Sequence, residues 1–246
     1  LAVDGKTVRG SGDGATSPIH MVSAFATECG LVLGQQKVDG KTKEITAIPE
    51  LLDALLIKGY LVTIDAMGCQ SEIAAKILEK KADYLLAVKG NQPGLQVALQ
   101  ERFGLAQRDA LHEAGHSAQL TEESHGRFVW QGFWVAENKD VVDTERWPGC
   151  KMLGMVESLR KVGDKESAPE RRYYISSRVM TAAAFGKAVR AHWGIENGVH
   201  WMLDVNFRDD AATVRKDHAA ENLSRLKRIV LNLLKLETAT LAQFGK

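Results

Sequence analysis

LVTIDAMGCQ, residues 61–70, places an aspartate directly after four residues that favour a buried β-strand. Leu61 to Ile64 are apolar or β-branched, and Asp65 follows them without a spacer. A carboxylate at the end of a core strand costs free energy unless a hydrogen-bond donor or a cation satisfies it. The stretch therefore predicts a buried strand that carries a capping or functional carboxylate at its end.

A second aspartate follows an apolar run at the start of the chain. Leu1, Ala2 and Val3 form that run, and Asp4 comes next. If the two strands are neighbours in one sheet, the carboxylates of Asp4 and Asp65 converge and repel each other, and a divalent cation such as Mg²⁺ relieves the repulsion. The simpler interpretation, that each aspartate caps a turn or a helix, stays open on the residues alone.

The order of elements around these aspartates predicts a mixed sheet with helices on its faces. Three strand-like runs are followed by alternating helical and strand-like segments, which is typical of an α/β fold. In the first helix Pro49 suits the first turn and Gly59 suits the stop. The expected strands are 1–3, 19–25, 31–38, 61–64 and 84–88, and the expected helices are 45–56 and 73–78.

The rest of the chain divides into a β-rich stretch and a helical stretch. We interpret residues 97–177 as a β-rich insertion between two parts of one core, 1–96 and 178–246. From Thr181 onward the spacing of apolar residues is helical, and a last helix is predicted from about His218 to Lys235. Its expected core side is Leu223, Leu226, Val230, Leu233 and Leu234, and its expected basic side is Arg225, Lys227 and Arg228.

Composition indicates a packed globular protein without a disulfide framework. Of 246 residues, 45% are hydrophobic and 26% are charged, and the net charge of +1 neither requires nor excludes nucleic acid. Cys29, Cys69 and Cys150 form no CxxC pair, so we expect a reducing cytoplasm and a small buried role for Cys69. There is no membrane-spanning run and no signal peptide. Because the chain begins at Leu1 inside a strand-like run, we expect an upstream segment to be missing.

The segment HWGIENGVHW, residues 192–201, offers a third carboxylate. His192, Glu196 and His200 are spaced by four, so they are predicted to share one helical face. Glu196 is the best candidate to complete a metal site for phosphodiester chemistry, while a zinc site built on the two histidines and a plain solvated face are alternatives. Trp193 and Trp201 are expected to pack in the core rather than stack on a base.

Several motifs in a fixed order resemble one known family. They are AVDGKTVRGS (2–11), KTKEITAIPELL (41–52), VTIDAMGCQ (62–70), DYLLAVKGNQ (83–92), HGR (125–127) and HWGIENGVHWMLDVNFRDD (192–210). Together they resemble the H-repeat-associated transposases of bacterial insertion sequences, which are DDE transposases with a ribonuclease H-like fold. The resemblance covers residues 1–96 and 185–236 well. It implies Asp4, Asp65 and Glu196 as a catalytic triad that holds Mg²⁺ or Mn²⁺, with two ions expected.

The resemblance also implies the partners. It implies cutting and strand transfer at insertion-sequence ends in double-stranded DNA, by a homo-oligomer in the bacterial cytoplasm near the nucleoid, with an N-terminal DNA-binding segment. An inactive relic that only binds DNA or another partner is the alternative. The candidate DNA-binding residues are Lys6, Arg9, Lys89, Asn91, Gln92, Arg190, His192, His200 and Arg208.

The chain departs from the wider DDE pattern at two places. In the wider pattern an Arg lies four residues before the Glu and a Lys lies seven residues after it. This chain has His192 and Leu203 at those places, and Arg190 or Arg208 are candidates to replace the missing cations. Thr42-Lys43-Glu44 stands where many members have Ser-Asn-Glu, and Lys43 in place of that Asn puts its polar contact in doubt.

Overall fold

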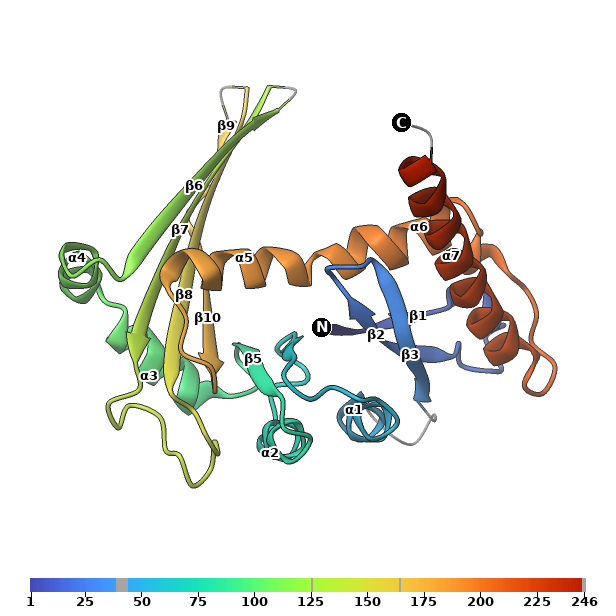
Figure 1. Ribbon diagram of the computed structural model, residues 1–246, viewed down its shortest axis with the longest axis horizontal. Helices are drawn as coiled ribbons and strands as arrows, with labels where there is room; N and C mark the ends of the chain where they lie inside the picture. Colours follow the sequence, from blue (N-terminus) through green and yellow to red (C-terminus); the bar gives the residue numbers. More distant parts are fainter. Residues whose placement is uncertain (39–43, 125, 164, 245–246) are drawn as a thin grey trace. The chain divides into compact units, whose positions relative to one another are not determined.

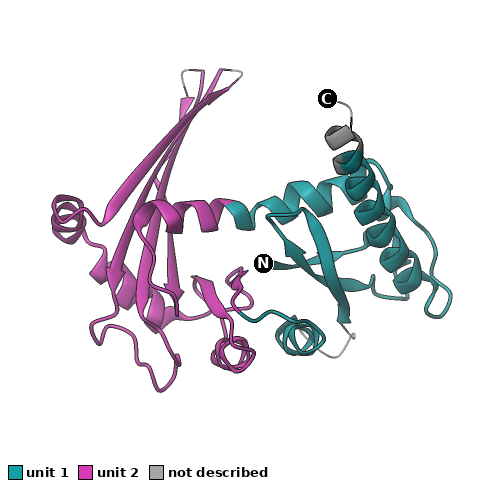
Figure 2. Cartoon of the chain, in the orientation of Figure 1, with its two compact units in different colours: residues 1–58, 191–246 teal, residues 59–190 magenta. Residues whose placement is uncertain are grey.

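The computed structural model describes residues 1–38, 44–124, 126–163 and 165–244 (Figure 1). The chain divides into two compact units, unit 1 with residues 1–58 and 191–246, and unit 2 with residues 59–190 (Figure 2). Strands in both units are flanked by helices, so the predicted α/β class is confirmed. The Thr42-Lys43 departure lies outside the described residues.

Unit 1 is built on an antiparallel meander in the order β3-β2-β1. The register places Asp4 opposite Ser23 and Lys6 opposite Met21. Helix α1 packs on β2 and β3, and α7 packs on β3. The elements are β1 (Ala2–Thr7), η1 (Arg9–Ser11), β2 (His20–Ala26), β3 (Leu31–Val38), α1 (Glu44–Asp53), the π-helical segment η2 (Glu196–His200), α6 (Trp201–Val205), η3 (Asp209–Ala211) and α7 (Ala219–Phe244).

The core of unit 1 joins the meander to the late helices. Aliphatic and aromatic side chains from β1, β2 and β3 meet those of η2, α6 and α7. This buries the apolar part of the HWGIENGVHWML segment against the first strands, although the two are far apart in sequence. The buried members of this cluster are Ala2, Phe25, Val32, Ile195, Val199, Leu203 and Leu231.

Unit 2 holds strands in the order β4-β5-β10-β8-β7-β6, with β9 paired to β8. Strands β4 and β5 run parallel, so their carboxyl ends lie at one edge, and the other pairs are antiparallel. The elements are β4 (Leu61–Ile64), α2 (Ser71–Glu79), β5 (Asp83–Val88), α3 (Pro93–Arg102), α4 (Leu105–Glu113), β6 (Ser117–Ser124), β7 (Arg127–Glu137), β8 (Met152–Val162), β9 (Lys165–Glu166), β10 (Glu170–Ser176) and α5 (Ala182–His192).

Two glycines let α5 approach the long strands of unit 2. A Cβ at Gly154 of β8 would lie 2.6 Å from the ring of Phe185, and a Cβ at Gly186 of α5 would lie 2.9 Å from the ring of Phe133. Phe185 also contacts Tyr174 edge to face. The core of unit 2 is therefore an aromatic cluster between α5 and the sheet, and the far ends of β6 to β9 extend beyond it (Figure 1).

The predicted order β-β-β-α-β-α-β is confirmed, and β3 and β4 have the predicted bounds. The prediction for the first helix is wrong at both ends. Pro49 lies in the interior of α1, which already includes Glu44, and the helix ends at Asp53. Gly59 instead has a φ of +80° in the turn before β4, where its N–H donates to the Lys81 carbonyl. Leu56 is consequently left 96% exposed.

The predicted orientation of the last helix is also wrong. Leu226, Val230, Leu233 and Leu234, expected in the core, are 41–59% exposed. Arg228, expected on a basic surface, is completely buried. The sheet face beneath α7 carries polar groups that bind the polar side of the helix, so the apolar side turns outward. The helix also continues to Phe244.

Candidate functional site

Asp65 follows β4 immediately, as predicted, and a tight turn holds its carboxylate. Oδ1 accepts hydrogen bonds from the backbone N–H groups of Met67 at 3.0 Å and Gly68 at 3.3 Å. This is the local arrangement that aspartate favours in turns. Oδ2 takes part in neither bond. The capping and metal-binding interpretations of Asp65 are therefore compatible, because the two roles use different oxygens.

The residues after β5 brace the loop that follows Asp65. Asn91 Nδ2 donates to the Ala66 carbonyl at 2.6 Å, and Gln92 Nε2 donates to the Cys69 carbonyl at 3.0 Å. The Gln92 side-chain oxygen accepts a bond from Arg146 at 3.1 Å. These two amides were predicted to contact DNA. The structure gives them partners within the loop, so they position Asp65 through its backbone.

Cys69 lies in this loop and is buried, as expected. Burial raises the pKa of its thiol to about 12, and the negative charge of Asp65 adds to the effect. Burial also raises the pKa of Cys150 to about 11. Neither thiol is therefore a nucleophile at neutral pH, because the reactive form is the thiolate.

Asp4 differs from its prediction, because it lies inside β1 rather than at its end. Strand β1 continues to Thr7, which pairs with His20 of β2. Asp4 Oδ2 lies 3.5 Å from Nδ1 of His200, the last residue of η2. The structure thus brings together Asp4 and one residue of the predicted His-Glu-His set.

His200 is a neutral neighbour of Asp4. Burial lowers the pKa of His200 to about 4, and the positive charges of Arg228 and Lys6 lower it further. A neutral imidazole does not cancel the charge of the Asp4 carboxylate. Among the described residues, its Nε2 is a buried atom without a hydrogen-bond partner.

Lys6, two residues after Asp4, is buried rather than available to DNA. Its Nζ lies 2.7 Å from the Asp204 carboxylate and 3.3 Å from that of Asp210. Asp210 also pairs with Arg9, whose side chain is 82% exposed. The Lys6 ammonium group is therefore engaged in two internal ion pairs, whereas the Arg9 side chain is accessible, and the DNA-binding role of both residues stays a prediction.

A second buried charge lies on α7. Arg228 Nε donates to Ser23 Oγ at 3.1 Å, and Nη1 donates to the Ser224 carbonyl at 3.1 Å. Lys227 pairs at 2.8 Å with Asp209, which is also buried. Sequence reasoning missed this network. Arg228 and Ser23 are 205 residues apart, and no local pattern signals their contact.

Glu196 begins η2 and is exposed, whereas His200 ends it and is largely buried. In a π-helical turn the hydrogen bonds join residues five apart, so a spacing of four no longer keeps side chains on one line.

Across the described ranges, no group of three or more His, Cys, Asp or Glu is arranged to hold a metal ion. Asp4 and Glu196 belong to unit 1 and Asp65 to unit 2.

The other predicted residues differ in their surroundings. Arg190 binds the side chains of Gln131 and Glu122, so its guanidinium is engaged inside unit 2. Lys89 and Arg208 are exposed, and His192 is half-buried. Trp201 is 54% exposed, so the prediction that it packs in the core is wrong.

A further contact beside Asp4 was not predicted. His20 Nε2 bonds to Glu44 Oε1, and His20 Nδ1 lies 2.8 Å from Thr7 Oγ1. A Cβ at Gly5 would overlap both Glu44 and His20. Gly5 is thus the residue that lets this pair lie against β1. The glycine that follows Asp4 was the one signal in the sequence of this contact between His20 and Glu44.

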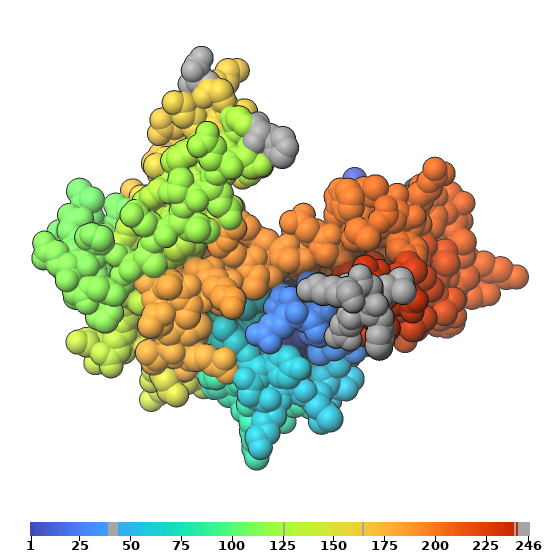
Figure 3. Space-filling view, turned by 45° about the horizontal axis from the view of Figure 1, so that its top comes forward, coloured from blue at the N-terminus to red at the C-terminus, as the bar shows by residue number. Residues whose placement is uncertain are grey.

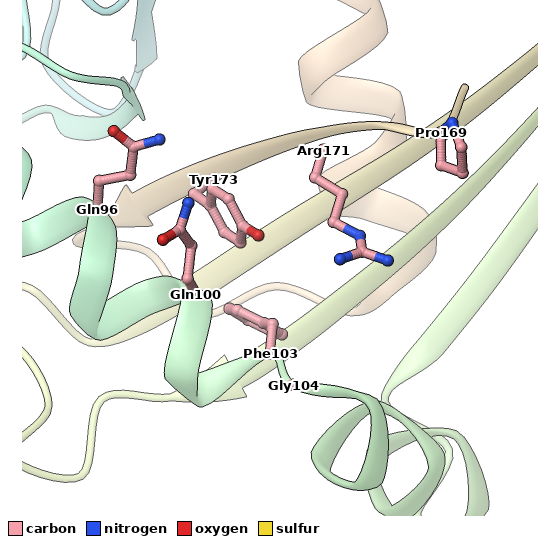
Figure 4. Close-up of a pocket in the computed structure, with 7 residues that line it drawn as sticks. All are labelled: Gln96, Gln100, Phe103, Gly104, Pro169, Arg171 and Tyr173. Atoms are coloured by element: carbon pink, nitrogen blue, oxygen red, sulfur yellow. The ribbon is translucent and has the colours of Figure 1, made fainter. Parts of the chain in front are cut away.

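Unit 2 also has an open pocket of about 460 Å³ between α3 and β10. Figure 4 shows Gln96, Gln100 and Phe103 from the α3 side, with Tyr173 and Arg171 from β10. Arg171 forms an ion pair with Glu157, with 2.6 Å between Arg171 Nε and Glu157 Oε2. The pocket contains none of the residues predicted for a site.

Comparison with known proteins agrees with the motifs. The family model for "Transposase DDE domain" matches residues 1–233. YncI of Escherichia coli O157:H7 is 48% identical over 241 residues, covering 96% of this chain and 61% of that protein. YhhI of E. coli K12 is 44% identical over 242 residues, covering 95% and 63%. Both names assign a transposase role provisionally, the second as H repeat-associated.

The chain spans less than two thirds of the length of these relatives. An uncharacterized protein of Xanthobacter autotrophicus is 41% identical over 179 residues, covering 72% of this chain and 59% of that protein. Within the described ranges, no helix has the length and apolar character needed to cross a membrane. From the extent of the family match and these identities, the chain belongs to the transposase DDE domain family.

Proposed function

We propose that this chain is the catalytic part of a DNA transposase, with Asp4, Asp65 and Glu196 as its acidic triad. The observation that carries the proposal is the way in which the Asp65 carboxylate is held. Neutral backbone amides hold one oxygen of its carboxylate directly after a buried strand, inside a family motif. That arrangement fixes the direction of the carboxylate, as a ligand of a hard cation requires.

The donor set fits Mg²⁺ or Mn²⁺. Carboxylate oxygens are the ligands that these ions prefer, and the neighbour of Asp4 is an imidazole that stays neutral at pH 7. Asp4, Asp65 and Glu196 would hold these ions through their carboxylate oxygens. When bound, the ions supply an activated water or DNA 3′-hydroxyl and stabilise the leaving oxygen. His200 then orients Asp4, and the loop braced by Asn91 orients Asp65.

The proposed substrate is DNA at the ends of an insertion sequence. The proposed location of the protein is the bacterial cytoplasm. The exposed side chains of Arg9, Lys89 and Arg208 are the proposed phosphate contacts, because lysine and arginine mostly position the DNA backbone. We propose a division into a core, residues 1–96 and 178–246, and a β-rich insertion, residues 97–177, and the run of strands from β6 to β10 is the observation that supports the insertion.

The test replaces Asp65 by asparagine and measures Mn²⁺ binding and nicking of DNA that bears the element ends. Asp143→Asn is the matched control, because Asp143 Oδ1 also accepts a backbone N–H, that of Glu145, in an exposed turn outside the family motifs. We expect Asp65→Asn to abolish nicking and weaken Mn²⁺ binding, and Asp143→Asn to change neither. Equal nicking by Asp65→Asn and the unmutated chain would overturn the assignment.

The alternative is a catalytically inactive relic that binds DNA or another partner. It predicts that the unmutated chain retards DNA fragments in a gel but never nicks them at any Mn²⁺ concentration. Weak Mn²⁺ binding that Asp65→Asn does not alter would support this alternative.

A further inference from the structure

The pocket between α3 and β10 in unit 2 is lined by polar side chains that the fold does not use. Gln96 and Gln100 are four residues apart on α3, so they share one side of the helix, and Tyr173 lines the pocket from β10 (Figure 4). Within the ranges that the structure describes, neither amide side chain nor the Tyr173 hydroxyl has a hydrogen-bond partner. Unused donors and acceptors that line one cavity are typical of a small-molecule site.

Arg171 brings a positive charge to the same pocket. Its hydrogen bond to Glu157 uses Nε, and no hydrogen bond of the described residues uses either of its Nη groups. Glu157 also accepts two bonds from Arg108, both at 3.1 Å. Two guanidinium groups therefore share one carboxylate, and this trio carries an excess positive charge. A guanidinium with both Nη groups unused can bind phosphate in a bidentate way.

The Arg171 side chain is open to an incoming ligand, because it is 47% exposed. It lies near the start of β10, where that strand pairs with β8. Figure 3 shows the far ends of β7 (light green) and of β8 and β9 (yellow) at the surface of unit 2. An anion can therefore reach Arg171 without any change of the fold.

The size and the rings of the pocket indicate what else the ligand carries. A cavity of about 460 Å³ lies within the range of small-molecule sites. Phe103 and Tyr173 supply aromatic rings to its lining, which favour an aromatic group of the ligand. A glutamine amide matches the donor and acceptor on the edge of adenine. The pocket thus offers a contact for each part of a nucleotide: base, base edge and phosphate.

We propose that this pocket binds a free nucleoside monophosphate. Its phosphate accepts hydrogen bonds from the Nη groups of Arg171, its base packs against the two aromatic rings, and Gln100 pairs with the edge of the base. Because the pocket is open, the ligand buries less surface than in an enclosed site, and we expect a Kd of about 0.1–1 mM. Binding requires neither the acidic triad nor a metal ion, so its failure and a failure of the proposed function are distinguishable.

The test is an NMR titration of the ¹⁵N-labelled 246-residue chain with AMP, in buffer without divalent cations. We expect the amide signals of α3 and β10 to shift. Adenosine and inorganic phosphate are the partial probes, and we expect each to bind at least about tenfold more weakly than AMP, because each lacks one set of contacts. A hydrogen bond to a charged group is worth about a tenfold change in affinity or more.

Arg171→Gln removes the proposed phosphate contact. We expect AMP to bind to it at least about tenfold more weakly, with the affinity for adenosine unchanged. Arg172→Gln is the matched control, because Arg172 is the next residue of β10, points to the other face of the sheet and also pairs with a glutamate, Glu170. Gln100→Ala weakens the binding of AMP and of adenosine alike.

Circular dichroism checks that the variants stay folded, which is expected because Glu157 keeps Arg108 as a partner and Gln100 is exposed. Unshifted α3 and β10 signals at about 10 mM AMP would overturn the proposal, since that concentration is at least about ten times the expected Kd. Equal AMP affinity of Arg171→Gln and Arg172→Gln would also overturn it. Tighter binding of a 5′-phosphorylated trinucleotide than of AMP, lost in Arg171→Gln, would overturn the assignment to a free nucleotide in favour of a strand end.

Discussion

Replacing Arg228 by methionine tests whether the buried ionic network stabilises unit 1. The substitution roughly preserves side-chain volume, so the change isolates charge and hydrogen bonding. It removes the donors to Ser23 and Ser224 and the positive charge that acts on buried Asp209, which keeps Lys227 as its ion-pair partner. Leaving buried hydrogen-bond acceptors without a donor costs about 1–3 kcal/mol. We therefore expect the free energy of unfolding to fall by about that amount.

Urea-induced unfolding followed by circular dichroism measures the change. In a thermal scan the same loss corresponds to a fall in Tm of roughly 2–12 °C, at about 2–4 °C per kcal/mol for a chain of this size. Arg225→Met, three residues earlier on the same helix, is the control. Arg225 is 43% exposed and pairs with Glu221, so its loss costs about 0–1 kcal/mol. If Arg228→Met were as stable as the control, the network would not stabilise the fold.

Four further predictions concern single groups. Gly5→Ala forces a Cβ against Glu44 and lowers stability by about 1–3 kcal/mol in urea, whereas an unchanged midpoint would show that Glu44 moves away freely. In the native protein at pH 8 a thiol reagent modifies Cys29 alone. Above pH 9 the free energy of unfolding falls, because the unfolded chain loses the Cys69 proton while the native chain keeps it up to about pH 12. A free energy of unfolding that stays constant from pH 9 to 11 would contradict this prediction. Asn91→Ala loosens the loop after Asp65, seen as faster amide exchange there with little change in β5.

Local signals predicted the strands and the position of Asp65 directly after one of them. The run before Asp65 is short, apolar and β-branched, and β4 has the bounds that this run suggests. The turn after it needs only nearby atoms, the amides of Met67 and Gly68. Such features depend on a few consecutive residues, so a sequence displays them directly.

Features that depend on distant partners could not be predicted. Lys6 was expected just after the end of a strand, which suggested a cation open to DNA, yet its partner Asp204 is 198 residues away. The π-helical turn from Glu196 to His200 is likewise invisible in a spacing of four, and with it Trp201 turns outward. In each case the spacing gave a candidate, and tertiary contacts decided its environment.

The orientation of α7 has a cause that links the candidate site to the exposed leucines of this helix. Asp4 lies directly opposite Ser23 in the β1–β2 register, so the side of the sheet that presents the carboxylate is polar at this point. A helix that covers this part of the sheet needs polar residues, and α7 supplies Ser224 and Arg228 there. Amphipathic periodicity fixes only that the two sides of a helix differ, not which side faces the protein. Because the polar side is required inside, the leucines are left outside.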